Sequence, residues 1–190
     1  MKSRSRHALL ASLSLLLCWS ARAPADAPAP AAALARPDGQ HDFDFEFGDW
    51  RAHVKRRVKP LSGSDEWIEY SGPSIVRKAW NGAANIGEID LTGPKGERLQ
   101  GMSVRLYDPT THEWRIHWAN RNEGSIGPAM VGGFRNGRGE FYDQETFQGR
   151  SIYVRFIFSD ITAKSFRIEQ AFSPDGGKTW ETNWIATFER

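Results

Sequence analysis

The sequence lacks most of the features that identify enzymes and membrane proteins. Its one cysteine, Cys18, stands near the N-terminus, so the remainder of the chain holds neither a disulfide framework nor a cysteine-based metal site. It contains no Gly-x-Ser-x-Gly motif and no glycine-rich loop between a strand and a helix that would cradle a phosphate. No apolar run after Leu17 is long enough to span a bilayer. We therefore assign no catalytic residue, no cofactor, no metal ligand and no membrane span.

Net charge and helical periodicity are also scarce. The 190 residues include 25 Lys and Arg against 23 Asp and Glu, a formal charge of +2. Residues 38–190 alone hold 20 basic and 22 acidic residues, so the basic excess belongs to the N-terminal segment. A domain this close to neutrality gives no reason to expect a nucleic-acid partner. After residue 37 no segment sustains a 3.6-residue apolar period, so we expect no long helix.

The N-terminal segment has the composition of an export signal. Lys2, Arg4 and Arg6 precede the apolar run Ala8–Leu17, and small residues follow. This order is typical of a secretory signal peptide. We expect three parts: a signal peptide at residues 1–23, with a cleavage site that is open up to residue 35, an Ala/Pro-rich leader or tether at 24–40, and one domain at 41–190. Such a protein is exported, either to the periplasm or to the medium.

What the domain does contain is a series of alternating polar and apolar runs separated by turn signals. Asp175-Gly176 and Asn136-Gly137 are typical of tight hairpin turns, because Gly and Asn tolerate the positive φ that these turns need. Eight to ten such strands, each with one apolar face, indicate an all-β meander. The sequence therefore predicts a single up-and-down antiparallel β-barrel of 8–10 strands.

The turn at Gly176 sets a predicted register for the last hairpin. Folding the chain about it places Gln170 opposite Thr182 and Ile168 opposite Trp184. One face of the hairpin is then aromatic and aliphatic with a polar pair in its middle. We expect that face to point into the barrel.

A second turn, at Thr162, gives a separate prediction of which side of the same strand faces inward. Folding about Thr162 places Val154 opposite Gln170, and it sets Arg155 against Glu169 as a cross-strand ion pair. Both turns direct Gln170 inward, and a one-residue slip would break this agreement.

Three further segments carry expectations. The runs Leu99–Leu106 and Trp114–Asn120 are expected to pair so that Met102, Val104 and Leu106 share the face of Trp114 and Trp118. Asp42–Phe47 alternates acid and Phe, which predicts an extended segment with solvated carboxylates on one side. Gly124–Gly139 is rich in glycine and predicts a mobile mouth or lid.

A few polar residues interrupt the predicted apolar face, and they mark the candidate site. Buried polar groups cost about 1–3 kcal/mol each when unpaired, so they need partners or a wet cavity. Either they satisfy one another in a plugged core, or they orient a small ligand between aromatic walls. The predicted ligand-binding residues are Trp50, Arg56, Trp118, Asn120, Gln170, Thr182 and Trp184.

The histidines do not form a recognisable metal or haem site. His112 and His117 nearly match the zinc-protease motif, but their spacing is five and a strand would point them to opposite faces. His53, His112 and His117 are all predicted to face outward, so a haem inside the barrel would lack the usual axial ligand.

The segment Gly48-Asp49-Trp50 resembles the G-x-W opening strand of lipocalin-like, or calycin, barrels. In those barrels the Trp plugs the closed end and a basic residue near the last strand lies across it, for which Arg190 is the counterpart here. Further motifs follow in order: Phe43-x-Phe45, Trp80-Asn81-Gly82-x-Ala84-Asn85 with Glu88, Arg105-Leu106-Tyr107-Asp108-Pro109, Trp114-x-x-x-Trp118-Ala119-Asn120, Gly149-Arg150 with Val154-Arg155-Phe156, and Glu169-Gln170-Ala171-Phe172-Ser173 through Trp184. Over residues 43–190 they resemble a bacterial family of exported lipocalin-like proteins of unknown function. The resemblance implies the fold and export, and no activity.

Three functions remain open at this point. The first is a binding protein that holds a small hydrophobic or amphipathic molecule. The second is an isomerase- or cyclase-like enzyme on a hydrophobic substrate, for which Asp143, Glu145 or Glu88 would supply the internal acid or base. The third is an interaction module that uses the Gly124–Gly139 loop. Neither the ligand nor the oligomeric state follows from the sequence.

Overall fold

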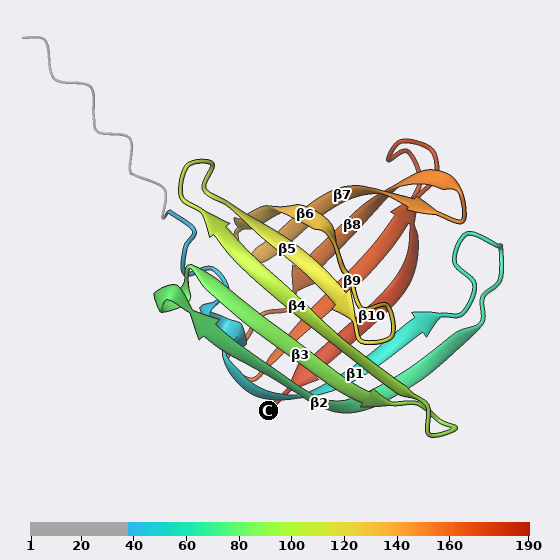
Figure 1. Cartoon of the computed structure of the whole chain (residues 1–190), viewed down its shortest axis with the longest axis horizontal. Helices are drawn as coiled ribbons and strands as arrows, with labels where there is room; N and C mark the ends of the chain where they lie inside the picture. Colours follow the sequence, from blue (N-terminus) through green and yellow to red (C-terminus); the bar gives the residue numbers. More distant parts are fainter. Residues whose placement is uncertain (1–37) are drawn as a thin grey trace, which may run out of the picture. The chain divides into compact units, whose positions relative to one another are not determined.

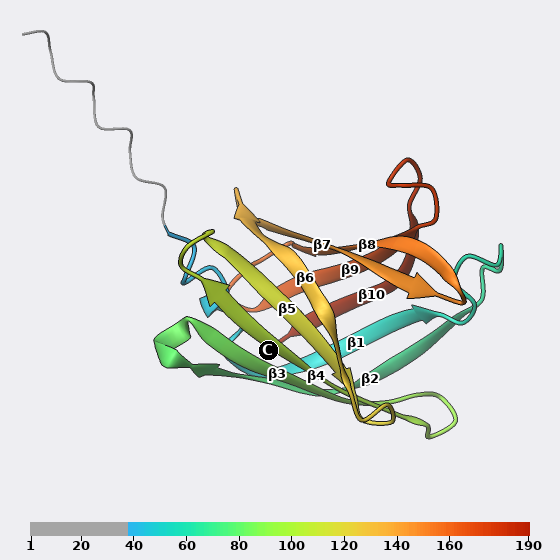
Figure 2. The same ribbon diagram turned by 45° about the horizontal axis from the view of Figure 1, so that its top comes forward.

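The computed structural model describes residues 38–190, and the expected signal peptide and most of the expected leader lie outside the described residues. The described chain forms ten antiparallel strands that close into one barrel, as Figures 1 and 2 show. The strands are β1 (Gly48–Arg57), β2 (Trp67–Ala79), β3 (Ala84–Thr92), β4 (Arg98–Asp108), β5 (Glu113–Asn120), β6 (Ile126–Arg135), β7 (Arg138–Phe147), β8 (Arg150–Ser159), β9 (Ser165–Ser173) and β10 (Glu181–Glu189). Two short 3-10 helices, η1 (Asp44–Glu46) and η2 (Trp80–Gly82), complete it.

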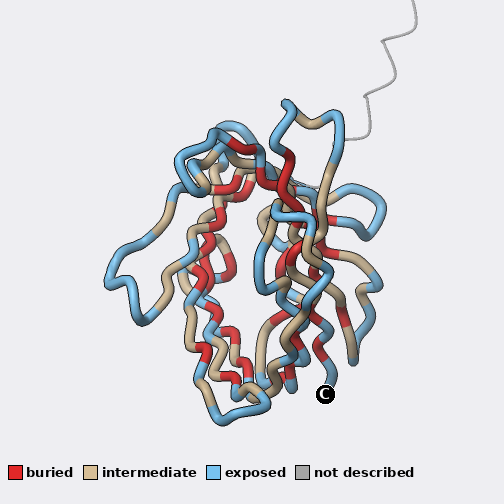
Figure 3. Tube along the Cα trace, turned by 90° about the vertical axis from the view of Figure 1, so that its right-hand side faces the viewer, coloured by how far each residue is buried: buried red, intermediate tan, exposed pale blue. Residues whose placement is uncertain are grey.

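Each strand pairs with its sequence neighbours, and β1 pairs with β10 to close the ring. The predicted all-β, up-and-down barrel is therefore confirmed. Alternating burial along the strands explains the closure, because every second side chain points into the ring, as the alternating colours of Figure 3 illustrate. Within residues 38–190 no helix has the length and apolarity needed to cross a membrane.

Connections alternate between the two ends of the barrel. The end that carries the N-terminal residues of the described chain is called the closed end, and the opposite one the open end. The closed end holds residues 38–47, 80–83, 109–112, 136–137, 160–164 and 190, and the open end holds 58–66, 93–97, 121–125, 148–149 and 174–180.

An aromatic cluster fills the closed end. The ring of Phe43 meets Trp114 and Phe134 edge-on, each at a centroid distance of 4.9 Å. Phe158 lies 5.2 Å from the same ring, also edge-on. Such edge-to-face pairs add to the free energy gained by burying the rings. This end of the barrel is a packed core.

Trp50 belongs to the same core, and Arg190 covers it at this end of the barrel. The indole Nε1 of Trp50 donates a hydrogen bond of 2.7 Å to the Glu46 carbonyl. The Arg190 guanidinium lies 4.0 Å from the Trp50 ring centroid, and its Nη1 donates to the Phe47 carbonyl at 2.8 Å. The arrangement that the G-x-W resemblance implied for Arg190 is present.

The extended conformation predicted for Asp42–Phe47 is wrong. Residues 44–46 form η1, and Glu46 is buried although its neighbour Asp44 remains exposed. The helical turn rotates the acidic side chains away from a common face. A carboxylate thus enters the closed end, where Arg105 neutralises it.

The predicted register of the last hairpin is also wrong, by two residues over most of its length. Gln170 pairs with Trp184 and Ile168 with Ala186, and a bulge separates this part from Thr182. A shift by two keeps every side chain on its face, so Gln170 and Trp184 still point inward. At the bulge the parity changes, and Thr182 pairs with Ala171 on the outward face.

The β8–β9 register shifts by two in the same way. Arg155 lies opposite Ala171, so the predicted ion pair between Arg155 and Glu169 does not form. Arg155 instead places its guanidinium 4.6 Å from the Trp180 ring centroid on the outside of the barrel. Glu169 contacts Arg167 of its own strand.

The predicted face of β4 is inverted. Ser103 pairs with Trp118 and Arg105 with Ile116, so these residues point inward. Met102, Val104 and Leu106 therefore lie on the outer face.

The lid predicted over Gly124–Gly139 is wrong as well, because most of this stretch is β6. Only the Asn136-Gly137 turn within it matches the prediction, with φ values of 54° and 74°. Gly132 of β6 pairs with Trp114 on one side and with Phe141 on the other. Gly132 serves close packing between strands, because a Cβ there would lie 1.9 Å from the Glu140 carbonyl oxygen.

The turn after β9 is organised around Asp175. This carboxylate accepts hydrogen bonds from the Thr179 hydroxyl at 2.6 Å and the Thr179 amide at 2.9 Å, and the Ser173 hydroxyl donates to it at 2.8 Å. These bonds lower the pKa of Asp175 to about 2. The carboxylate thus substitutes for backbone pairing within the turn.

Replacing Asp175 by Ala is expected to lower the thermal unfolding temperature. The pKa of Asp175 is lower when folded than when unfolded, so its contribution is complete above pH 3.8 and disappears as the pH falls through about 2. Calorimetric melts at pH 7 and pH 2 measure this, and the two proteins should converge at the lower pH. Lys178→Ala, in the same turn, is the matched control and should melt as the wild type does. An unchanged unfolding temperature at pH 7 would show that the Asp175 carboxylate does not stabilise the turn.

Candidate ligand-binding site

Burial inside the barrel changes from one end to the other. Inward side chains of the closed end, such as Trp114 and Phe141, are completely buried. In the open half, Trp118 points inward beside Ser103 but is 36% exposed. Trp184 and Gln170 pair with each other on the inner face and are only half-buried. Because inward side chains with exposed surface must border water-accessible space, part of the interior of the open half is open to water, although Leu91, Ile152 and Val154 in the same half are fully buried.

Aromatic and aliphatic side chains form most of this wall. Trp118 lies against the inner surface of β4, where its ring covers Gly101 so closely that a Cβ there would overlap it. Four further half-buried inward side chains are Tyr70, Ile89, Phe156 and Trp184. Three of the four are aromatic, so the wall is suited to a flat apolar group.

Two amides meet at the bulge of β10. The Gln170 Nε2 donates to the Asn183 Oδ1 at 3.0 Å. Asn183 is 3% exposed, and its Nδ2 has no hydrogen-bond partner within residues 38–190. The sequence predicts Thr182, and not Asn183, as the inward polar residue opposite Gln170. The bulge turns the Thr182 side chain outward. The Thr182 carbonyl accepts a hydrogen bond of 3.3 Å from Arg57 Nε. Register alone does not reveal a bulge, and so Asn183 was missed.

Four of the seven sequence-predicted site residues lie on the inner face of the open half. They are Trp118, Asn120, Gln170 and Trp184. Asn120 sits at the rim, where its Oδ1 accepts the Asn122 amide at 2.9 Å.

The remaining predicted residues lie elsewhere. Trp50 is buried at the closed end beneath Arg190 and does not share a space with Trp118 and Trp184. Arg56 pairs with Ile68 and Trp184 at the end of β1, but its side chain is exposed at the rim. β1 is ten residues long and reaches from one end of the barrel to the other. Trp50 and Arg56 therefore lie on the same inward face but at opposite ends of the barrel.

Two carboxylates also point into the open half. Asp143 pairs with Val154 and Glu145 with Ile152, and both partners are 1% exposed residues of the inner face. Glu88, the third candidate for an internal acid, pairs with Ile75 and Met102 on the outer face and lies 3.9 Å from Arg77. Of the three candidates for an internal acid or base, Asp143 and Glu145 are therefore the two on the inner face.

A buried ion pair closes the floor beneath this space. The Arg105 guanidinium contacts the Glu46 carboxylate through Nη1, which also donates to Asn85 Oδ1 at 3.0 Å. All three side chains are buried. Burial raises the pKa of Glu46 to about 7, although the charge of Arg105 acts in the opposite direction. Arg105 was assigned to the outer face, so sequence reasoning missed this pair.

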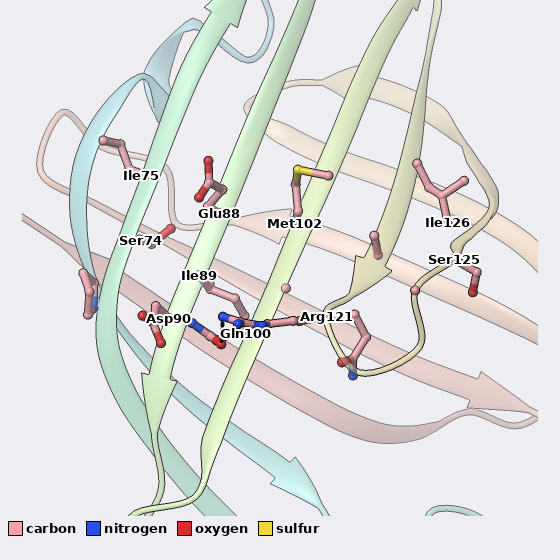
Figure 4. Close-up of a pocket in the computed structure, with 15 residues that line it drawn as sticks. Ser74, Ile75, Glu88, Ile89, Asp90, Gln100, Met102, Arg121, Ser125 and Ile126 are labelled. Atoms are coloured by element: carbon pink, nitrogen blue, oxygen red, sulfur yellow. Dashed lines mark hydrogen bonds between the residues drawn. The ribbon is translucent and has the colours of Figure 1, made fainter.

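Two hollows also lie on the outside of the barrel. The larger, about 570 Å³, crosses the outer face of β2 to β5 and reaches the β5–β6 turn. Figure 4 shows Ile75, Glu88 and Met102 along it, with Ile126 at its far edge. The smaller, about 370 Å³, lies between His53, Glu69 and Arg167.

The histidines lie outside the interior. His53 and His112 are exposed, and His112 belongs to the β4–β5 turn, where its Nδ1 lies 3.0 Å from the Tyr107 hydroxyl. His117 points outward, and its Nδ1 lies 3.0 Å from the Gly127 carbonyl. The part of the chain that the structure describes holds no group of three or more metal-ligating side chains.

Comparison with known proteins adds similarities of fold. No family model matches the chain. Curated proteins give no match either. Among solved structures, the chain is similar to EF1p2_mFAP2b bound to DFHBI, with 9% identity, a TM-score of 0.44, and coverage of 80% of this chain and 98% of that chain. The redesigned β-barrel mFAP0 bound to DFHBI gives 10% identity, a TM-score of 0.43 and coverage of 77% and 99%. A de novo designed fluorescence-activating β-barrel gives 11% identity, a TM-score of 0.42 and coverage of 77% and 94%. Similarity at this level carries no inference about ligands, and the fold assignment rests on the strand pairing.

Proposed function

We propose that this chain is an exported β-barrel protein that holds a small apolar or amphipathic molecule in the open half of its interior. The proposal is carried by Trp118, Trp184 and Gln170, which point inward and still keep accessible surface. Export is supported by the basic residues and apolar run of residues 1–23 and by the resemblance to exported bacterial lipocalin-like proteins.

The chemistry of the wall supports an amphipathic ligand. Ligand sites generally combine an apolar lining with a few polar groups that fix orientation. Here the lining is mainly aromatic, and its polar groups are the amide pair Gln170 and Asn183 and the carboxylates Asp143 and Glu145. The packed closed end provides a floor, so a ligand enters from the open end.

Filling the interior is expected to remove binding. Ile89→Phe adds volume to an inward, half-buried position of β3, so the affinity for an interior ligand should fall about tenfold or more. The matched control is Ile86→Phe on the outer face of the same strand, which should bind as the wild type does. Native mass spectrometry and Trp-fluorescence quenching against lipids, isoprenoids and aromatic compounds measure both. Both measurements use protein recovered from the periplasm or the medium. The mass of this protein also shows whether the signal peptide has been removed.

The same screen can contradict the proposal. It fails if wild-type protein neither retains a ligand from the cell nor binds any compound of the screen. Binding that survives Ile89→Phe would show that the ligand does not contact this part of the inner wall.

A second candidate function is an enzyme that uses the same interior. It is favoured by the inward position of Asp143 and Glu145, since a general acid or base must reach the substrate. Burial, and then the charge of Asp143, raises the pKa of Glu145. In the screen above, this function predicts that a bound compound is released with altered mass or altered double-bond position.

A further inference from the structure

The carboxylates Asp143 and Glu145 lie two residues apart on the inner face of β7. Successive inward residues of a strand are separated by about 7 Å, so both carboxylates border the same part of the open half. Asp143 has one oxygen, Oδ1, that accepts from the Gln144 amide at 2.6 Å. Its other oxygen, Oδ2, is buried and has no hydrogen-bond partner among residues 38–190.

Neither carboxylate has a counterion in the described part of the chain. None of the ion pairs within residues 38–190 includes Asp143 or Glu145. The buried Arg105 is already paired with Glu46. A partly desolvated carboxylate without a partner costs free energy, and a cation from outside the protein would remove that cost.

Arg57 does not supply the missing charge. Its guanidinium lies at the open rim, 2.8 Å from Asp65 and 3.8 Å from Glu181. It also donates to the Ser64 and Thr182 carbonyls. Arg57 is thus held by its own contacts and forms no ion pair with Asp143 or Glu145.

A second polar group without a partner lies on β10, next to the inward-facing Gln170. The Nδ2 of Asn183 is a donor without a partner among the described residues, in a side chain that is 3% exposed. Its Oδ1 is fixed by the inward-facing Gln170, so the amide is oriented. From β7 to β10 is three strand spacings, about 14 Å along the curved wall. A ligand that reaches both sites needs a donor at one end and an acceptor at the other.

The walls between these polar sites suit a cation with an apolar body. Trp118, Trp184 and Phe156 are inward aromatic side chains with accessible surface. An ammonium group is attracted to aromatic faces, by about 0.5–2 kcal/mol when partly desolvated. Carboxylates and aromatic rings together therefore favour an amine over a carboxylate.

We propose that the ligand of the open half is an amphipathic amine, with a protonated nitrogen held by Asp143 and Glu145, an aromatic or apolar body, and an oxygen acceptor facing Asn183. This rests on the proposed interior binding site and names the class of molecule that it takes. The amine compensates both carboxylates, and its apolar body covers the accessible aromatic surface.

Three probes of similar size test the charge preference directly. Tyramine carries an amine and a phenol oxygen, phenethylamine carries the amine alone, and 3-(4-hydroxyphenyl)propionate carries a carboxylate in place of the amine. Titrations followed by NMR at about pH 7.5 are expected to show tyramine binding at least about tenfold more tightly than the propionate. Phenethylamine should lie between them, and Asn183→Ala should bring tyramine down to the affinity of phenethylamine.

Asp143→Asn separates a binding role from a structural one. It keeps an acceptor for the Gln144 amide and removes the charge, so tyramine affinity should fall at least about tenfold while the ligand-free protein melts at a higher temperature. The matched control is Glu140→Gln, which removes a carboxylate from the outer face of the same strand and should leave tyramine affinity unchanged.

Two results would overturn the amine assignment. One is equal affinity for tyramine and the propionate, and the other is unchanged tyramine affinity in Asp143→Asn. If apolar or neutral compounds of the earlier screen still bind in a manner sensitive to Ile89→Phe, interior binding stands and only the amine assignment falls. If those compounds and all three probes fail to bind, both fall.

Discussion

Arg105→Met is expected to lower the free energy of unfolding by about 3–5 kcal/mol, because it leaves the Glu46 carboxylate buried without a countercharge. Arg105 also stands 4.9 Å from the Phe43 ring centroid, so the change removes a contact of the aromatic floor. Denaturation in urea, followed by circular dichroism, measures the loss. The effect should depend on pH. The pKa of Glu46, already raised to about 7 by burial, rises further without Arg105, and protonation relieves the isolated charge at low pH. The variant should therefore lose less stability at about pH 5 than at about pH 8.

The double variant Arg105→Met with Glu46→Leu supplies the control. It removes both charges together, so no buried ion remains, and its stability should return to within about 1 kcal/mol of the wild type or exceed it. Glu46→Leu alone isolates the Arg105 guanidinium and should be as damaging as Arg105→Met. If Arg105→Met is tolerated at about pH 8, the ion pair does not hold η1 against the floor.

The alternation of the sequence was sufficient to predict the fold but not the pairing. Period-2 patterns and the turns at Gly176 and Asn136-Gly137 predict a closed antiparallel meander, and ten strands are found. A register error of two residues leaves all faces unchanged, so the pattern cannot detect it. This is why Gln170 and Trp184 were placed inward correctly although their predicted partners were wrong.

The failures have identifiable physical causes. On β4 the outward residues Met102, Val104 and Leu106 are more apolar than the inward Ser103 and Arg105, so hydrophobicity favours the wrong face. Arg105 is tolerated inside because Glu46 neutralises it from 59 positions away, a contact that no local pattern reveals. The prediction that Thr182 points inward is wrong for a different reason. The β-bulge between Thr182 and Trp184 reverses which residues of β10 face inward, and the amino-acid composition of the strand does not reveal it.

Gly132 of β6 is a position where a single added methyl group is expected to lower the stability of the protein. Gly132→Ala should destabilise the protein by about 1–3 kcal/mol, or prevent folding, because a Cβ at this position would lie 1.9 Å from the Glu140 carbonyl oxygen of β7. Backbone cannot move aside as a flexible side chain can, so β6 and β7 would have to separate beside Trp114 and Phe141. Thermal and urea unfolding measure the change.

Gly133→Ala is the matched control, one residue further along the same strand. A Cβ there meets nothing within 4 Å, so its stability should stay within about 0.5 kcal/mol of the wild type. The comparison distinguishes two explanations for a glycine-rich segment. If β6 needs glycine for mobility, both substitutions should have similar effects, and interior binding should change with each. If it needs glycine for close approach, as the structure indicates, only Gly132→Ala is damaging. Equal effects of the two would thus contradict the assignment of this stretch as a packed strand of the barrel wall.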